Sequence, residues 1–157
     1  IEFKPNRLGH CIFLSDESEV VVELDIPVEI CPTSNVAGAQ CNLPEMLPHL
    51  LKFKKYEDPN LIVCCDDTLL FNTNLSMEFF EFAKVMKMSE PSQMKKFLIK
   101  NIDAIFTDDD HLKELLKSEI ENNIDTVTAI EGLPLLSISN LINPLNMQCS
   151  IYSSILI

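Results

Sequence analysis

Several common functional signatures are absent from this sequence. Its only glycines are Gly9, Gly38 and Gly132, which are too far apart to form a glycine-rich phosphate loop. Its six cysteines form no CxxC pair, which argues against a disulfide framework and against a cysteine-based structural zinc site. There is no secretory signal with a basic start and an apolar centre. We therefore expect a cytoplasmic protein with reduced cysteines.

Charge and composition further restrict the kinds of protein that this sequence can encode. Hydrophobic residues make up 46% of the 157 residues and charged residues 23%, which is ordinary for one globular domain. The net charge is -12, and no cluster of Lys and Arg with interleaved aromatic residues is present. A nucleic-acid partner is therefore not expected. The excess of acid is the pattern of a solvated, mutually repelling surface.

Three short apolar runs end in polar residues that can support chemistry. They are NRLGHCIFL (residues 6–14), IPVEICPTSN (26–35) and LIVCCDDTLLF (61–71). Short apolar runs punctuated by Pro and Asn are typical of buried parallel strands, although periodicity alone does not separate them from buried helix. We expect a strand in each.

Helical patterns lie between and after these runs. Ser15, Ser76 and Thr107 are the expected caps of three helices, and Pro48 delays or kinks another. The predicted helices cover residues 15–24, 43–55, 76–88, 89–106 and 107–123. Alternation of strands and helices predicts an α/β fold with parallel strands.

Residues 132–157 carry no charge and are long enough to span a membrane. Several Pro, Asn and Gln residues interrupt the segment, and no basic residue flanks it. A membrane span is therefore disfavoured. We expect an irregularly docked tail or a stretch of foreign sequence.

Polar residues follow each expected strand. His10, the CPTSN turn and the pair Asp66 and Asp67 would lie at the carboxyl edge of a parallel sheet, where chemistry collects in such folds. The two acids could face a cation and a polar ligand. The alternative is a helix cap or a solvated turn.

The segments RLGH (residues 7–10), VEICPTSNV (28–36) and CDDTLLFNTNLSMEF (65–79), in this order, resemble the carboxyl-terminal part of the adenosine deaminase family. The resemblance covers roughly residues 6–121. It implies the carboxyl-terminal part of a TIM (β/α)8 barrel, about the last three strands with their helices. We expect this part to occupy residues 1–122. An apolar tail that need not be homologous to the family then covers residues 123–157.

The same resemblance implies roles for three residues. His10 would be the active-site histidine that orients and helps deprotonate a zinc-bound water, and Asp66 would be a zinc ligand. Asp67 would accept a hydrogen bond from the purine near N7. Zinc lowers the pKa of its water towards about 7, so that hydroxide can attack C6 of adenine. A cysteine-liganded deaminase site with a PCxxC signature is absent.

Other residues of catalytic type are assigned structural roles. Glu29 could face the barrel interior or a neighbouring strand and is assigned no chemistry. Ser34 and Asn35 are expected to form a plain turn. His49 and His111 are expected to have surface or packing roles, and Cys64 and Cys65 to be small core residues. The family usually has Thr and Pro at the positions of Cys65 and Thr68. These two differences change the residues next to Asp66 and Asp67, but they do not remove a ligand.

The family's other metal ligands are missing. No HxH pair occurs, only one of four zinc ligands is present, and a full barrel needs about 250 residues. Because the chain begins with Ile1, we expect sequence to be missing upstream. We predict a deaminase of adenosine, AMP or N6-methyl-AMP whose 157-residue part is inactive alone. The alternative is a non-catalytic interaction protein. No nucleic-acid or membrane partner is expected.

Overall fold

The computed structural model describes residues 5–14, 17–42 and 47–128, the last five of these by their backbone alone. The chain divides into two compact units, residues 1–86 and 87–157, and each is described by itself.

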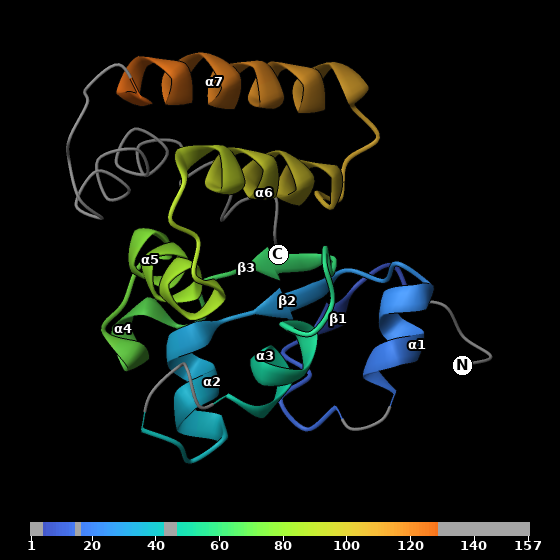
Figure 1. The fold of residues 1–157 in the computed structure, drawn as a ribbon, viewed down its shortest axis with the longest axis vertical. Coiled ribbons are helices and arrows are strands. Elements are labelled where there is room, and N and C mark those ends of the chain that lie inside the picture. Colours follow the sequence, from blue (N-terminus) through green and yellow to red (C-terminus); the bar gives the residue numbers. More distant parts are fainter. Residues whose placement is uncertain (1–4, 15–16, 43–46, 129–157) are drawn as a thin grey trace. The chain divides into compact units, whose positions relative to one another are not determined.

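The first unit is built on a parallel sheet (Figure 1). Its strands are β1 (Leu8–Gly9), β2 (Val28–Ile30) and β3 (Leu61–Val63), in the spatial order β1-β2-β3. The paired residues are Leu8 with Val28, Gly9 with Glu29, Val28 with Leu61, Glu29 with Ile62 and Ile30 with Val63. The three expected strands are therefore confirmed, each shorter than its apolar run.

Helices connect and follow the strands of this unit. They are α1 (Ser18–Glu23), α2 (Pro32–Gly38), α3 (Pro48–Phe53), α4 (Thr68–Phe71) and α5 (Leu75–Met86). The late start predicted for the helix at Pro48 is confirmed. Helices α2 and α4 were not predicted, because CPTSN has the composition of a turn and α4 has only four residues.

The core of the first unit lies between the sheet and its helices. Val28 and Ile30 of β2 and Phe82 of α5 are fully buried, whereas Glu29 between the two strand residues is partly exposed. Helix α5 packs against β3 and α2. Its burial therefore holds β3 and the helix that follows β2 in place.

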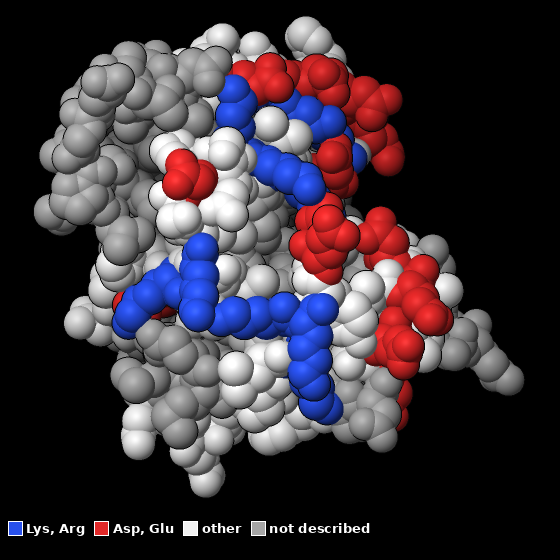
Figure 2. Space-filling model, viewed as in Figure 1, with Lys and Arg blue, Asp and Glu red and all other residues white. Residues whose placement is uncertain are grey.

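The second unit contains α6 (Pro91–Asp103) and α7 (Asp110–Thr128), which pack against each other. Figure 2 shows acidic and basic side chains interspersed over these helices. The domain boundary predicted after residue 122 falls inside α7. Residues 129–157 lie outside the described part of the chain, so the predictions for the tail stay predictions. No helix within the described ranges is both long and apolar enough to cross a membrane.

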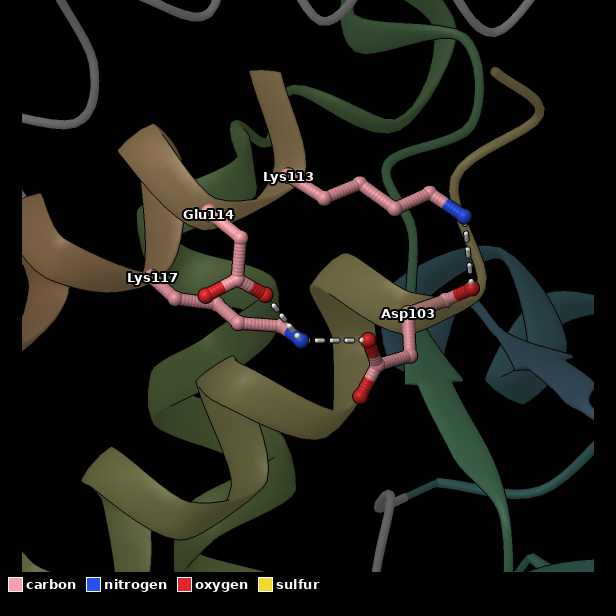
Figure 3. Close-up of polar contacts among 4 residues, drawn as sticks. All are labelled: Asp103, Lys113, Glu114 and Lys117. Atoms are coloured by element: carbon pink, nitrogen blue, oxygen red, sulfur yellow. Dashed lines mark hydrogen bonds and ion pairs between the residues drawn. The ribbon is translucent and has the colours of Figure 1, made fainter. Parts of the chain in front are cut away.

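A lysine joins the two helices of the second unit (Figure 3). Lys117 Nζ lies 2.8 Å from Asp103 Oδ1 and 3.2 Å from Glu114 Oε1, and Lys113 Nζ donates to the carbonyl oxygen of Asp103 at 3.4 Å. The hydrogen bond to Asp103, followed by that to Glu114, raises the pKa of Lys117. The group therefore ties the end of α6 to the first turns of α7.

Two of the predicted helix caps were wrong by two residues. The side chain of Asn74 accepts a hydrogen bond from Met77 N–H at 3.0 Å, so Asn74 caps α5 and Ser76 lies inside the helix. The side chain of Asp109 accepts a backbone N–H of the first turn of α7 at 3.0 Å, and Thr107 forms a turn before it. The third expected cap, Ser15, lies outside the described residues.

Candidate active site

Polar residues of the first unit gather where the three strands end. His10 directly follows β1, α2 begins two residues after the end of β2, and Asp66 and Asp67 come shortly after β3. The strands are parallel and adjacent, so their carboxyl ends share one edge of the sheet. This is the edge at which parallel α/β folds place their chemistry.

A strained turn presents His10. The φ angles of His10 and Cys11 are 56° and 52°, in the left-handed region that non-glycine residues rarely occupy. Cys11 N–H donates to the carbonyl oxygen of Gly9 at 2.6 Å, which closes the turn. Backbone strain of this kind is concentrated at functional sites. The turn ends β1 abruptly and fixes the direction from which His10 leaves the sheet.

Asn35 connects His10 to the end of β2. Its side chain is only 1% exposed, its Oδ1 accepts a hydrogen bond from Cys31 N–H at 3.2 Å, and its Nδ2 lies 2.8 Å from His10 Nδ1. Ser34 Oγ also donates to the Cys31 carbonyl at 3.3 Å. The sequence-based assignment of Ser34 and Asn35 to a plain turn was wrong, because both lie in α2 and one contacts His10.

The two adjacent acids have different hydrogen bonds. Asp67 Oδ1 accepts from the N–H groups of Leu69 and Leu70 at 3.0 and 2.8 Å, so Asp67 caps α4. Asp66 Oδ1 accepts from Asp67 N–H at 2.9 Å. Both residues are exposed, and within the described ranges the second carboxylate oxygen of each accepts no hydrogen bond. The cap alternative is thus observed for Asp67, and each acid keeps one oxygen for a ligand.

The thiol of Cys31, which follows β2, and that of Cys64, which follows β3, are neighbours. A hydrogen bond with Cys64 raises the pKa of Cys31 most strongly, followed by burial and by the charges of Cys64 and Asp66. Asp66 therefore lies close enough to Cys31 for its charge to act there. A thiol with a raised pKa stays protonated at neutral pH, so Cys31 is a structural residue rather than a nucleophile.

Glu29 of β2 also has a structural role. Glu29 Oε1 forms an ion pair with Nε of Arg7, the residue that precedes β1. The pair ties β1 to β2, in keeping with the structural role predicted for Glu29.

Glu78 of α5 holds the start of α2 in place. This carboxylate is 1% exposed, Oε1 accepts from Thr73 Oγ1 at 2.6 Å, and Oε2 accepts from Thr33 N–H at 2.9 Å. Its partners are 5 and 45 residues away in sequence, and the motif match at Glu78 gave no sign of this role. The buried acid therefore fixes the helix turn that carries Asn35.

Replacing Glu78 with glutamine is expected to lower the free energy of unfolding by about 1–3 kcal/mol, because two buried hydrogen bonds to a carboxylate become weaker bonds to an amide and the Thr73 hydroxyl has to accept instead of donate. Urea unfolding of the 157-residue chain measures the loss. Glu81→Gln is the control, since Glu81 forms only a 3.7 Å surface pair with Lys84, worth about 0–1 kcal/mol. Equal losses for the two variants would refute the role given to Glu78.

His49 of α3 is buried without a hydrogen bond. It is fully buried, and neither ring nitrogen has a partner among the described residues. Burial, and then the charge of His10, lowers the pKa of His49 to about 4. Of the surface and packing roles predicted for His49, its burial agrees with the packing role.

The buried His49 predicts a dependence of stability on pH. The folded state keeps His49 neutral down to about pH 4, whereas the unfolded chain takes up a proton near pH 6.5. Between these values the unfolded state binds more protons, so stability falls as the pH is lowered and then levels off, by up to about 3 kcal/mol. His49→Leu is expected to reduce this slope in urea unfolding between pH 7 and 4. His111→Leu, at an exposed site on α7, should keep the wild-type slope. A wild-type slope in the His49 variant would contradict the assignment.

The described residues do not form a complete metal site. No group of three or more His, Cys, Asp or Glu side chains among them could hold a metal ion. Asp66, with its free oxygen, is the candidate ligand, whereas zinc sites use at least three protein ligands. The donor set of the described residues therefore does not fit a bound zinc by itself.

Known proteins are similar to this chain in sequence and in fold. A family model described as Adenosine deaminase matches residues 1–123. The N6-mAMP deaminase of Arabidopsis thaliana is 33% identical over 116 residues, which are 73% of this chain and 32% of that protein. The N6-Methyl-AMP deaminase of Mus musculus is 31% identical over 120 residues, covering 72% of this chain and 32% of that protein.

A solved structure of Arabidopsis ADAL complexed with IMP superposes with a TM-score of 0.69 and 29% identity. The match covers 80% of this chain and 36% of that one. The chain thus spans about a third of the length of the curated relatives it matches. Its fold is part of an adenosine deaminase-type TIM barrel, as predicted.

Proposed function

The chain belongs to the adenosine deaminase family, and on this premise we propose that it supplies the carboxyl-terminal catalytic edge of a purine nucleotide deaminase acting on N6-methyl-AMP. Water would add at C6 and methylamine would leave, so that N6-methyl-AMP and water give IMP and methylamine. Relatives from a plant and a mammal carry this substrate in their names, and one solved neighbour was determined with IMP.

One observation carries the proposal. His10, Asp66 and Asp67 follow two of three adjacent parallel strands at a single edge, and Asn35 after the middle strand bonds to His10. Deamination needs a group that holds the attacking oxygen and a group that holds the purine. These side chains come from separate strand ends of a rigid sheet, which is how such folds position reacting groups.

Each residue has an assigned part in the reaction. His10 would hold the attacking oxygen near C6 through its Nε2, since its Nδ1 is engaged by Asn35. The free oxygen of Asp67 would accept a hydrogen bond from the purine near N7, while the other oxygen stays on the α4 cap. The free oxygen of Asp66 would contribute one ligand to the zinc of the family, whose remaining ligands we place in parts of the enzyme other than these 157 residues. Because one ligand does not make a zinc site, the 157-residue chain should be inactive alone.

A substrate comparison tests the proposal. The complete gene product that contains residues 1–157 is purified, and its ultraviolet absorbance is followed with N6-methyl-AMP, AMP and adenosine in separate assays. We expect kcat/KM to be highest for N6-methyl-AMP. A preference for adenosine would make the protein a nucleoside deaminase instead, and the absence of turnover with all three would refute a catalytic role. We also propose a place in the reducing cytoplasm, which suits the absence of disulfides among the described cysteines.

A further inference from the structure

The amide of Asn35 has only one orientation that satisfies its neighbours. The oxygen and nitrogen ends of an Asn side chain have nearly the same shape, so hydrogen-bond partners decide which is which. One end lies 3.2 Å from Cys31 N–H, a group that can only donate. That end must be the oxygen. The other end, 2.8 Å from His10 Nδ1, is therefore the NH2 group and donates to the ring.

This orientation determines which nitrogen of His10 carries the proton. Nδ1 accepts from Asn35 and must present its lone pair, so the neutral ring carries its proton on Nε2. A proton added to Nδ1 would face the NH2 group of Asn35. The amide cannot rotate by 180° to accept that proton without losing its hydrogen bond from Cys31 N–H.

We propose that Asn35 is a positioning residue that holds His10 as the Nε2–H tautomer, so that His10 donates a hydrogen bond to the attacking oxygen rather than removing its proton. The inference rests on the function proposed above for its catalytic meaning. It modifies the role implied by the family resemblance, in which this histidine helps to deprotonate water. While Asn35 is in place, the proton on Nε2 stays on the ring and fixes the direction of the oxygen lone pair.

The surroundings of Asn35 are rigid enough for this task. The side chain is 1% exposed, its own N–H donates to the Cys31 carbonyl at 2.9 Å, and the helix turn that carries it is held by the buried Glu78 through Thr33. His10 in turn leaves β1 from a left-handed turn. Neither partner can therefore move without disturbing a strand end or a buried hydrogen bond. Outer hydrogen-bond partners of this kind commonly control the tautomer of active-site histidines.

The tautomer can be measured without substrate or metal. Two-bond 1H–15N correlations of the imidazole rings in the 15N-labelled 157-residue chain, recorded at pH 8, distinguish Nδ1–H from Nε2–H. The sequence has only three histidines, so His49→Gln and His111→Gln assign the signals. We expect His10 to show the Nε2–H pattern. A wild-type ring with the Nδ1–H pattern, or a mixture of the two, would overturn the proposal.

An isosteric variant tests the cause. In Asn35→Asp one carboxylate oxygen keeps the Cys31 N–H and the other faces Nδ1, so His10 should change to the Nδ1–H or doubly protonated pattern. The control Asn74→Asp makes the same chemical change at an exposed helix cap and should leave His10 unaltered. Backbone amide spectra establish that each variant is folded, and an unfolded Asn35→Asp leaves the wild-type pattern as the deciding result. An unchanged His10 pattern in folded Asn35→Asp would contradict the proposal.

In the complete enzyme, Asn35→Asp should lower kcat by about 10- to 100-fold and leave KM close to wild type, because the substrate contacts remain. This arm depends on deaminase activity, whereas the tautomer pattern does not. A correct tautomer in a protein that turns over no purine would refute the proposed function and leave the role of Asn35 standing.

Discussion

His10→Ala in the complete deaminase is expected to lower kcat for N6-methyl-AMP by about 10²- to 10³-fold, the loss that follows removal of one preorganised donor in an active site. The effect should appear mainly in kcat, because His10 is placed against the attacking oxygen and not against the purine. Initial rates followed by ultraviolet absorbance over a range of substrate concentrations separate kcat from KM.

The control for this experiment is another histidine. His111 lies exposed on α7 in the second unit, and His111→Ala should keep the wild-type rate. The circular dichroism spectra of both variants are compared with wild type, so that a folding defect is not read as lost chemistry. Wild-type kcat in folded His10→Ala would remove His10 from the active site.

Phe82→Ala is expected to lower the free energy of unfolding of the 157-residue chain by about 3–5 kcal/mol. Phe82 is fully buried on α5, the helix that packs against both β3 and α2, so its removal leaves a cavity next to the segments that position the site. Because such a loss is comparable to the whole stability of many domains, Phe82→Leu provides a milder variant, expected to cost about 1 kcal/mol.

Phe13→Ala is the matched control, since Phe13 is 82% exposed and its removal should change stability by less than about 0.5 kcal/mol. Urea unfolding followed by circular dichroism measures all three variants. A loss for Phe13→Ala as large as that for Phe82→Ala would show that the buried face of α5 is wrongly assigned.

Much of the fold could be predicted from the sequence, because its strongest signals are local. The apolar runs around Val28 and Ile62 identify buried strands, and the alternation with helices indicates that the strands are parallel. The error at Ser76 has a local cause, since Asn74 is an equally good cap two residues earlier. Helix α2 was missed because Pro32 serves both turns and the first position of a helix.

The positioning residues of the site could not be predicted, because their partners are distant in sequence. The bond between Asn35 and His10 spans 25 residues, and that between Glu78 and Thr33 spans 45. Composition and periodicity carry no information about such pairs. The residue types at the strand ends indicated where chemistry would collect, and only the folded chain shows which side chains hold His10.

The central claim is that these strand ends act in a purine nucleotide deaminase when they are joined to the rest of the barrel. Absorbance assays with Zn²⁺ and N6-methyl-AMP, run in parallel on the complete gene product and on the purified 157-residue chain, test it most directly. The account predicts conversion to IMP by the complete product and none by the isolated chain. Turnover by the isolated chain, or an inactive complete product with full zinc content, would contradict it.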